Sequence, residues 1–196
     1  ESSEQNVKKT EQEIKKQVEG FLEILETKDL SKLDEKGTKE IEKQIQELKN
    51  KIEKLDSKKT SIETYSEYEE KINKIKEKLK DKKELEDKLK GLEDSLKKKK
   101  EERKKALEEA KKKFEEYKNQ AESATGVTHG SQVQRQGGVG LQAWRCANSL
   151  GLGVSYFSST GTDSNELAKK VIDDSIKKID EELKNTIENN GEVKKE

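Results

Sequence analysis

The chain has 196 residues, of which 44% are charged and 27% are hydrophobic, and its formal net charge is zero. A typical globular domain is about 25% charged and about 45–50% apolar, so this composition argues against a compact domain with one large core. The zero net charge also argues against indiscriminate binding to nucleic acid, which needs a local excess of cations.

The first two-thirds of the chain has the apolar spacing of long helices. Apolar residues at steps of three and four predict an amphipathic helix over about residues 5–30. The stretch SKLDEKGT (31–38) interrupts it, and Thr38 is the expected cap of the next helix. Ile and Leu then recur at steps of four and three, which predicts a helix of the coiled-coil type over 38–80. Polar residues enter this seam near 57–66, where the sequence leaves open a kink or a full turn.

A second break precedes another long helix. Asp81 and Glu84 have the spacing of a capping box, and the apolar pattern resumes over 84–123. Because this segment and the one before it have nearly equal lengths, we expect them to form an antiparallel hairpin. Region 1–123 is therefore predicted to be an elongated, antiparallel coiled coil or helical bundle, and the fold class to be all-α.

The composition changes abruptly after this region. Residues 124–162 hold eight of the twelve glycines and are expected to form a mostly irregular insertion, with a short helix over 141–150. A last helix, 163–190, begins at a capping box made by Asp163 and Glu166. Its apolar stripe is expected to pack on the bundle.

The segment KKKKEERKKALEEAKKK (97–113) is the markedly cationic stretch of the chain: residues 97–118 carry eleven basic and six acidic side chains. On a helix, lysines at this spacing form a cationic strip about two to three turns long. Flexible lysine side chains suit a sulfated polysaccharide, whose charges repeat along a line. The candidate glycosaminoglycan-binding residues are Lys97, Lys98, Lys99, Lys100, Arg103, Lys104, Lys105, Lys111, Lys112 and Lys113.

The same segment has a second interpretation as the solvated face of a coiled coil. In that interpretation glutamates pair with the lysine four residues later, as Glu101 with Lys105, Glu108 with Lys112 and Glu109 with Lys113. Exposed pairs of this kind contribute only about 0.5 kcal/mol each. The sequence does not decide between the two interpretations.

No catalytic or metal-binding constellation is expected. His129 is the single histidine, and Cys146 lies seventeen residues away, so a metal site lacks ligands. Cys146 next to Trp144 reads as a small buried hydrophobe, and a catalytic thiol would need a base. The sequence GGVG (137–140) lacks the Gly-Lys-Ser/Thr ending of a phosphate loop. We expect no enzyme activity and no cofactor.

Apolar residues are concentrated in segment 139–157, around Trp144, Tyr156 and Phe157. They are expected either to form a plug that packs against the helices or to form a protein-binding patch, because aromatic residues dominate binding hot spots. Both interpretations stay open at this stage.

Two stretches carry a resemblance to a known family. The segment SLKKKKEERKKALEEAKKKFEEYK (95–118), and the chain from SATGVTHG (123–130) through the last helix, resemble the outer surface protein F family. These are OspF-type members of the Erp surface lipoproteins of Lyme disease Borrelia. The resemblance covers nearly the whole chain and is most specific in the glycine-rich segment and the last helix.

The resemblance implies a lipoprotein on the bacterial cell surface, held in the outer membrane by a lipidated cysteine that would precede Glu1. It also implies adhesion to host glycosaminoglycans, chiefly heparan sulfate. Related lipoproteins of the same group capture complement regulators or other host proteins, which would fit the aromatic segment 139–157 as an alternative binding surface. The placement of a glycosaminoglycan on the lysine-rich segment follows from charge and not from the resemblance.

Overall fold

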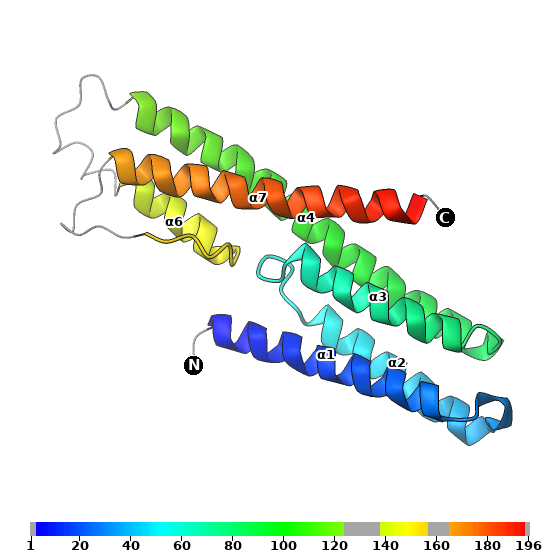
Figure 1. The fold of residues 1–196 in the computed structure, drawn as a ribbon. Helices are drawn as coiled ribbons and strands as arrows, with labels where there is room; N and C mark the ends of the chain where they lie inside the picture. The colour runs from blue at the N-terminus through cyan, green and yellow to red at the C-terminus, as the bar shows by residue number, and fades with distance from the viewer. Residues whose placement is uncertain (1–2, 124–137, 157–164, 195–196) are drawn as a thin grey trace. The chain divides into compact units, whose positions relative to one another are not determined.

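A computed structural model describes residues 3–123, 138–156 and 165–194 of the chain, with the side chains of residues 3 and 186–194 left out of the description. The α-helices are α1 (Ser3–Thr27), α2 (Glu35–Glu53), α3 (Ile62–Lys78), α4 (Glu86–Ser123), α6 (Val139–Ser149) and α7 (Asn165–Lys194), with 3-10 turns η1 (Leu30–Lys32) and η2 (Lys83–Leu85) (Figure 1). No strand occurs in these described ranges, which confirms the all-α prediction. Much of the expected glycine-rich insertion, at 124–137 and 157–162, lies outside them.

The chain divides into two compact units, Glu1–Glu102 and Arg103–Glu196. The division falls inside α4, so this helix contributes its first part to one unit and its second part to the other. The change of composition in the sequence predicts a boundary at the end of this helix, near residue 123. The apolar seam of α4 is interrupted between Leu96 and Leu107, where the buried position is taken by Arg103, and the division falls within this interruption.

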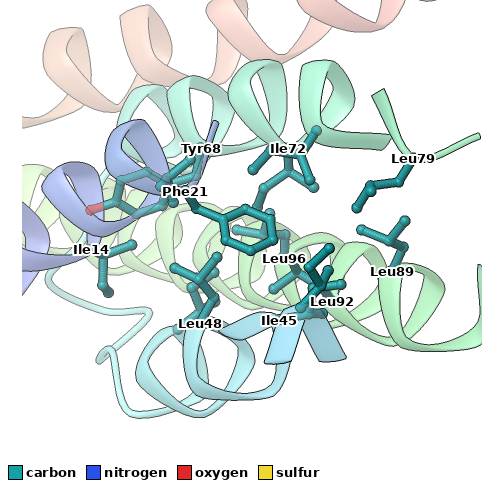
Figure 2. Close-up of a cluster of buried hydrophobic side chains, with 14 of the residues drawn as sticks. Ile14, Phe21, Ile45, Leu48, Tyr68, Ile72, Leu79, Leu89, Leu92 and Leu96 are labelled. Atoms are coloured by element: carbon teal, nitrogen blue, oxygen red, sulfur yellow. The ribbon is translucent and has the colours of Figure 1, made fainter. Parts of the chain in front are cut away.

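In the described part of the first unit, α1, α2, α3 and the first part of α4 run alternately in opposite directions and enclose one apolar core (Figures 1 and 2). Their core residues recur at steps of three and four, which places them on one face of each helix. The core consists of Ile14, Val18, Phe21, Leu25, Ile41, Ile45, Leu48, Ile52, Leu55, Tyr65, Tyr68, Ile72, Ile75, Leu79, Leu85, Leu89, Leu92 and Leu96.

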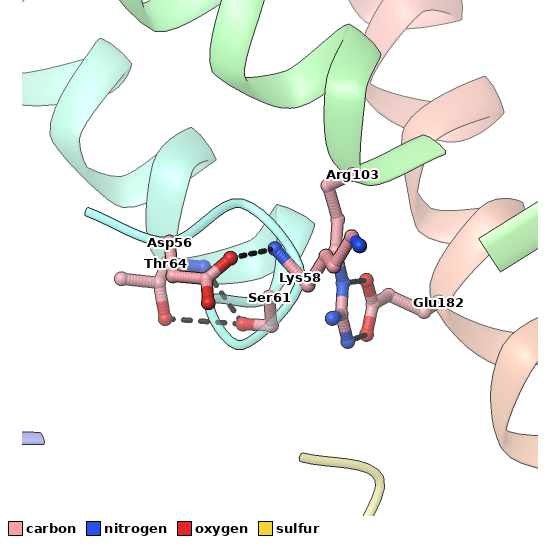
Figure 3. A network of polar contacts seen from close by, with 6 residues as sticks. All are labelled: Asp56, Lys58, Ser61, Thr64, Arg103 and Glu182. Atoms are coloured by element: carbon pink, nitrogen blue, oxygen red, sulfur yellow. Dashed lines mark hydrogen bonds and ion pairs between the residues drawn. The ribbon is translucent and has the colours of Figure 1, made fainter. Parts of the chain in front are cut away.

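The segment 38–80, for which the sequence left open a kink or a full turn, forms two helices joined by a full turn at 54–61. Side chains supply the hydrogen bonds that the helical backbone would otherwise make: Asp56 Oδ1 accepts from the Lys58 backbone N–H at 2.9 Å, and Ser61 Oγ accepts from the Thr64 N–H at 3.2 Å (Figure 3). Such local bonds compete with helix continuation. Ser61 is thus the N-cap of α3, and the question of kink or turn is decided in favour of a turn.

The turn between α1 and α2 also differs from expectation. Asp34, and not Thr38, caps α2: Asp34 Oδ1 accepts from the Gly37 backbone N–H at 2.7 Å. A Cβ at Gly37 would lie 2.7 Å from Leu33 Cδ1, so a larger residue here would displace the Leu33 side chain. Thr38 instead lies buried in the first turn of the helix.

The second unit combines the second part of α4 with α6 and α7. Small residues on α6 (Gly140, Ala143 and Ala147) are buried and let this helix approach α7 closely. Arg103 of α4 is 1% exposed, and its Nε and Nη2 donate to the two carboxylate oxygens of Glu182 on α7 at 2.8 and 3.0 Å (Figure 3). This two-bond geometry fixes the register of α7 along α4.

The first prediction compares two isoleucine truncations in the first unit. Ile72→Ala empties a fully buried position of the core and is expected to lower the free energy of unfolding by about 3 kcal/mol. Ile24→Ala at a side chain that is 49% exposed should change it by less than about 0.5 kcal/mol. Urea unfolding followed by circular dichroism measures both, and equal losses would contradict the described core.

The second prediction concerns the buried ion pair of the second unit. Arg103→Ala leaves Glu182 without its fork and is expected to cost about 3 kcal/mol, whereas the double variant Arg103→Met/Glu182→Leu should recover most of that loss. Trp144 is the single tryptophan of the chain, so its emission during urea unfolding reports on this unit. Lys105→Ala, at an exposed position of α4, is the control. Equal stability of Arg103→Ala and the control would show that the pair does not form.

Candidate functional site

Helix α4 carries all ten lysines and arginines that the sequence proposes for anion binding. The structure separates them into side chains that are engaged within the protein and side chains that are accessible to a ligand. The two units are considered in turn, because each contributes its own part of the set.

In the first unit, two of the four consecutive lysines are engaged. Lys99 Nζ donates to the Leu55 carbonyl in the turn after α2 at 2.6 Å. Lys100, whose side chain is 14% exposed, forms an ion pair of 3.1 Å with Glu69 on α3. Lys97 and Lys98 are exposed and make no hydrogen bond or ion pair with any residue that the structure describes.

In the second unit, Arg103 is buried against Glu182 and is not available to a polysaccharide. Lys111 pairs with Asp180 on α7 at 2.8 Å, and this hydrogen bond raises the pKa of Lys111. The remaining four lysines make no ion pair within the described part of the chain, and they are at least partly exposed: Lys104, Lys105, Lys112 and Lys113.

The glutamates of the segment do not neutralise these free lysines by direct pairing. No ion pair within 4.0 Å joins Glu101, Glu108 or Glu109 to a lysine among the residues described. The three carboxylates are nevertheless exposed on the same helix. The accessible charge of segment 97–113 is therefore six ammonium groups against three carboxylates, a smaller excess than the ten and four of the sequence.

The engaged cations could not be recognised from the sequence. Lys99 bonds a residue 44 positions away, and Arg103 bonds one 79 positions away, whereas periodicity reports only on neighbours along one helix. One local signal indicates that Arg103 faces inward: it lies four residues before the buried Leu107, and so on the same face of the helix. The lysine group that is left is at least partly exposed on the helix, and what it can do chemically is hold an extended anion at the surface.

The aromatic candidates form a fixed cluster in the second unit. The rings of Trp144 and Tyr156 lie 6.0 Å apart at 36°, and Trp144 Nε1 donates to the Val154 carbonyl at 3.1 Å. Both side chains are half-buried. Lys178 Nζ on α7 donates to the Gly153 carbonyl at 3.0 Å and so holds the segment next to Val154 against α7. Phe157 lies outside the described residues.

The remaining candidate groups do not form a catalytic or metal-binding site among the described residues. Cys146 on α6 is half-buried, and burial raises the pKa of its thiol, against an opposing effect of Lys113. Within the described ranges, no three residues among His, Cys, Asp and Glu gather as a metal site would require. His129 lies outside those ranges. The described helices include none with the length and apolar character needed to cross a membrane.

No family model, curated protein or solved structure matches this chain. The resemblance to the outer surface protein F family therefore stays a prediction from the motifs of the sequence.

The third prediction tests the state of the single thiol. Because burial raises the pKa of Cys146, less thiolate is present at pH 8 than in the unfolded chain, and alkylation by iodoacetamide should be several-fold slower in the native protein than in urea. The raised pKa also means that the contribution of this group to stability is lost as the pH rises above the range of an ordinary thiol. Alkylation of native protein as fast as in urea would contradict the burial of the thiol, and faster alkylation would indicate an activated cysteine.

Proposed function

We propose that this protein is a non-enzymatic lipoprotein of a bacterial outer surface that acts as a host adhesin and binds glycosaminoglycans such as heparan sulfate. The resemblance to the outer surface protein F family supports the location and the class of ligand. The exposed lysines of α4 support the mode of binding. No part of the proposal requires a cofactor or metal.

The observation that carries the proposal is the set of six accessible lysines on one helix, without partners among the described residues. Ammonium groups at the ends of flexible side chains neutralise a sulfated chain without the need for a fixed geometry. Binding of this kind derives mostly from the release of counterions and falls steeply with salt.

Of the ten cations that the sequence offers, we propose that six bind the ligand, because the other four are engaged within the protein. Lys99, Lys100, Arg103 and Lys111 hold helices and turns together, and a ligand would have to break those contacts to reach them. The proposed binding residues are Lys97, Lys98, Lys104, Lys105, Lys112 and Lys113.

The fourth prediction concerns binding to immobilised heparin at low salt. Replacement of the six accessible lysines by glutamine should weaken binding by at least about tenfold, because six cationic contacts are lost. A control variant removes six exposed lysines elsewhere, with the same change in net charge: Lys9, Lys16, Lys43, Lys54, Lys74 and Lys78. Surface plasmon resonance measures both, and circular dichroism checks that both remain folded.

The control variant is expected to retain most of the binding. If the α4 variant binds heparin as the unaltered protein does, the lysines of α4 are not the site. If the unaltered protein shows no heparin binding at low salt, the glycosaminoglycan proposal itself fails.

A second candidate function is capture of a host complement or plasma protein through segment 139–157. The partly exposed Trp144–Tyr156 pair favours it, since tryptophan and tyrosine are enriched in binding hot spots. The bond from Trp144 to Val154 also gives this pair a structural role, so a binding test needs a folded variant such as Tyr156→Ser. A serum-protein complex that resists salt and is lost in this variant would support the second function.

A further inference from the structure

Four lysines of the second unit form a group with a distinct chemical character. Lys104 and Lys105 make one pair, Lys112 and Lys113 make another, and none of the four has a hydrogen-bond or ion-pair partner among the described residues. A free ammonium group is a mobile point charge that accepts many directions of approach. Binding to this group therefore depends on the amount of negative charge on the ligand and not on the orientation of its anionic groups.

The group lacks a guanidinium that could read the geometry of a sulfate. Arg103 is the single arginine in the sequence of α4, and both arms of its fork bond to Glu182 in the interior of the second unit. Recognition of a particular sulfation pattern would call for directional, bidentate donors of that kind. In α4 the directional donor holds the fold together, and the mobile donors face the solvent.

The spacing of the two lysine pairs selects the length of the ligand. The pairs are eight residues apart on a continuous helix, which corresponds to about 12 Å along the axis. A compact anion such as inorganic sulfate can neutralise one pair but not both. A linear polymer can lie along the helix and neutralise both pairs at once.

Two exposed carboxylates, Glu108 and Glu109, lie in the sequence between the pairs and are not paired with them. They lower the local positive potential and repel an anionic chain that passes between the lysines. A polymer with few charges gains too little from the lysines to offset this repulsion. A densely charged polymer gains more contacts for the same repulsion.

We infer that this lysine group recognises the linear charge density of a sulfated polysaccharide and not the identity of its sugars. The inference rests on the proposed function and deepens it, because it states which property of the ligand is read. In this inference, Glu108 and Glu109 reduce the binding of weakly charged polysaccharides by electrostatic repulsion.

The first test compares three polymers of similar length at one low salt concentration. Heparin and dextran sulfate are both densely sulfated but have different sugar backbones, whereas hyaluronan carries only carboxylates. We expect heparin and dextran sulfate to bind within about threefold of each other, and hyaluronan to bind at least about tenfold more weakly. Isothermal titration calorimetry with the whole chain gives the three affinities.

The outcomes separate this inference from the proposed function. Tight binding of heparin with at least tenfold weaker binding of dextran sulfate would overturn the inference and leave the proposed function standing. Hyaluronan binding as tight as that of heparin would also overturn it. Absence of heparin binding would defeat both.

The second test removes this repulsion. Glu108→Gln/Glu109→Gln should raise the affinity for hyaluronan by a larger factor than the affinity for heparin, because the weakly charged polymer suffers most from the repulsion. The matched control is Glu63→Gln/Glu70→Gln, at exposed positions of α3, which changes the net charge by the same amount. Equal gains in the two variants would show that only the net charge of the protein matters, and the inference would be wrong.

Discussion

The structure depends on a shortage of apolar side chains. With 27% hydrophobic residues, the chain can form only a narrow apolar stripe on each helix, and most large apolar residues of the described helices are buried. Ile24 is the large hydrophobic residue that stays exposed in the described part. Because the stripes are narrow, charged side chains lie directly beside the core, and some of them are drawn into the contacts between helices.

This constraint gives lysine two functions along one helix. Lys99 and Lys100 hold the turn after α2 and the helix α3, and Lys111 holds α7, while their neighbours on α4 face the solvent. The same residue type therefore stabilises the fold at one position and is available for a ligand at the next. The proposed binding surface consists of exposed lysines, so its selectivity would come from charge.

The buried pair of Arg103 and Glu182 illustrates a consequence of the shortage of apolar residues: two charged side chains are removed from water. Withdrawal of two charges from water is unfavourable unless their geometry and hydrogen bonds are good. Here Nε and Nη2 of the guanidinium each donate to one oxygen of the Glu182 carboxylate. The pair contributes register more than net stability, since apolar residues could fill the same space. The pair also buries the single arginine of α4, the side chain that could have formed two directional hydrogen bonds to a sulfate.

The sequence by itself determined the helices and their inward faces, because periodicity at steps of three and four is a local property of each segment. The apolar seams of α2, α3 and α4 are the core positions of the structure, such as Ile45, Ile72 and Leu92. The tertiary structure decided the full turn at 54–61, the division of α4 between two units, and the sorting of its cations into engaged and free. For the turn and the division, the sequence marks only an interruption of the apolar seam. The sorting of the cations depends on contacts such as those of Lys99 and Arg103 with residues 44 and 79 positions away, and a local pattern holds no information about these contacts.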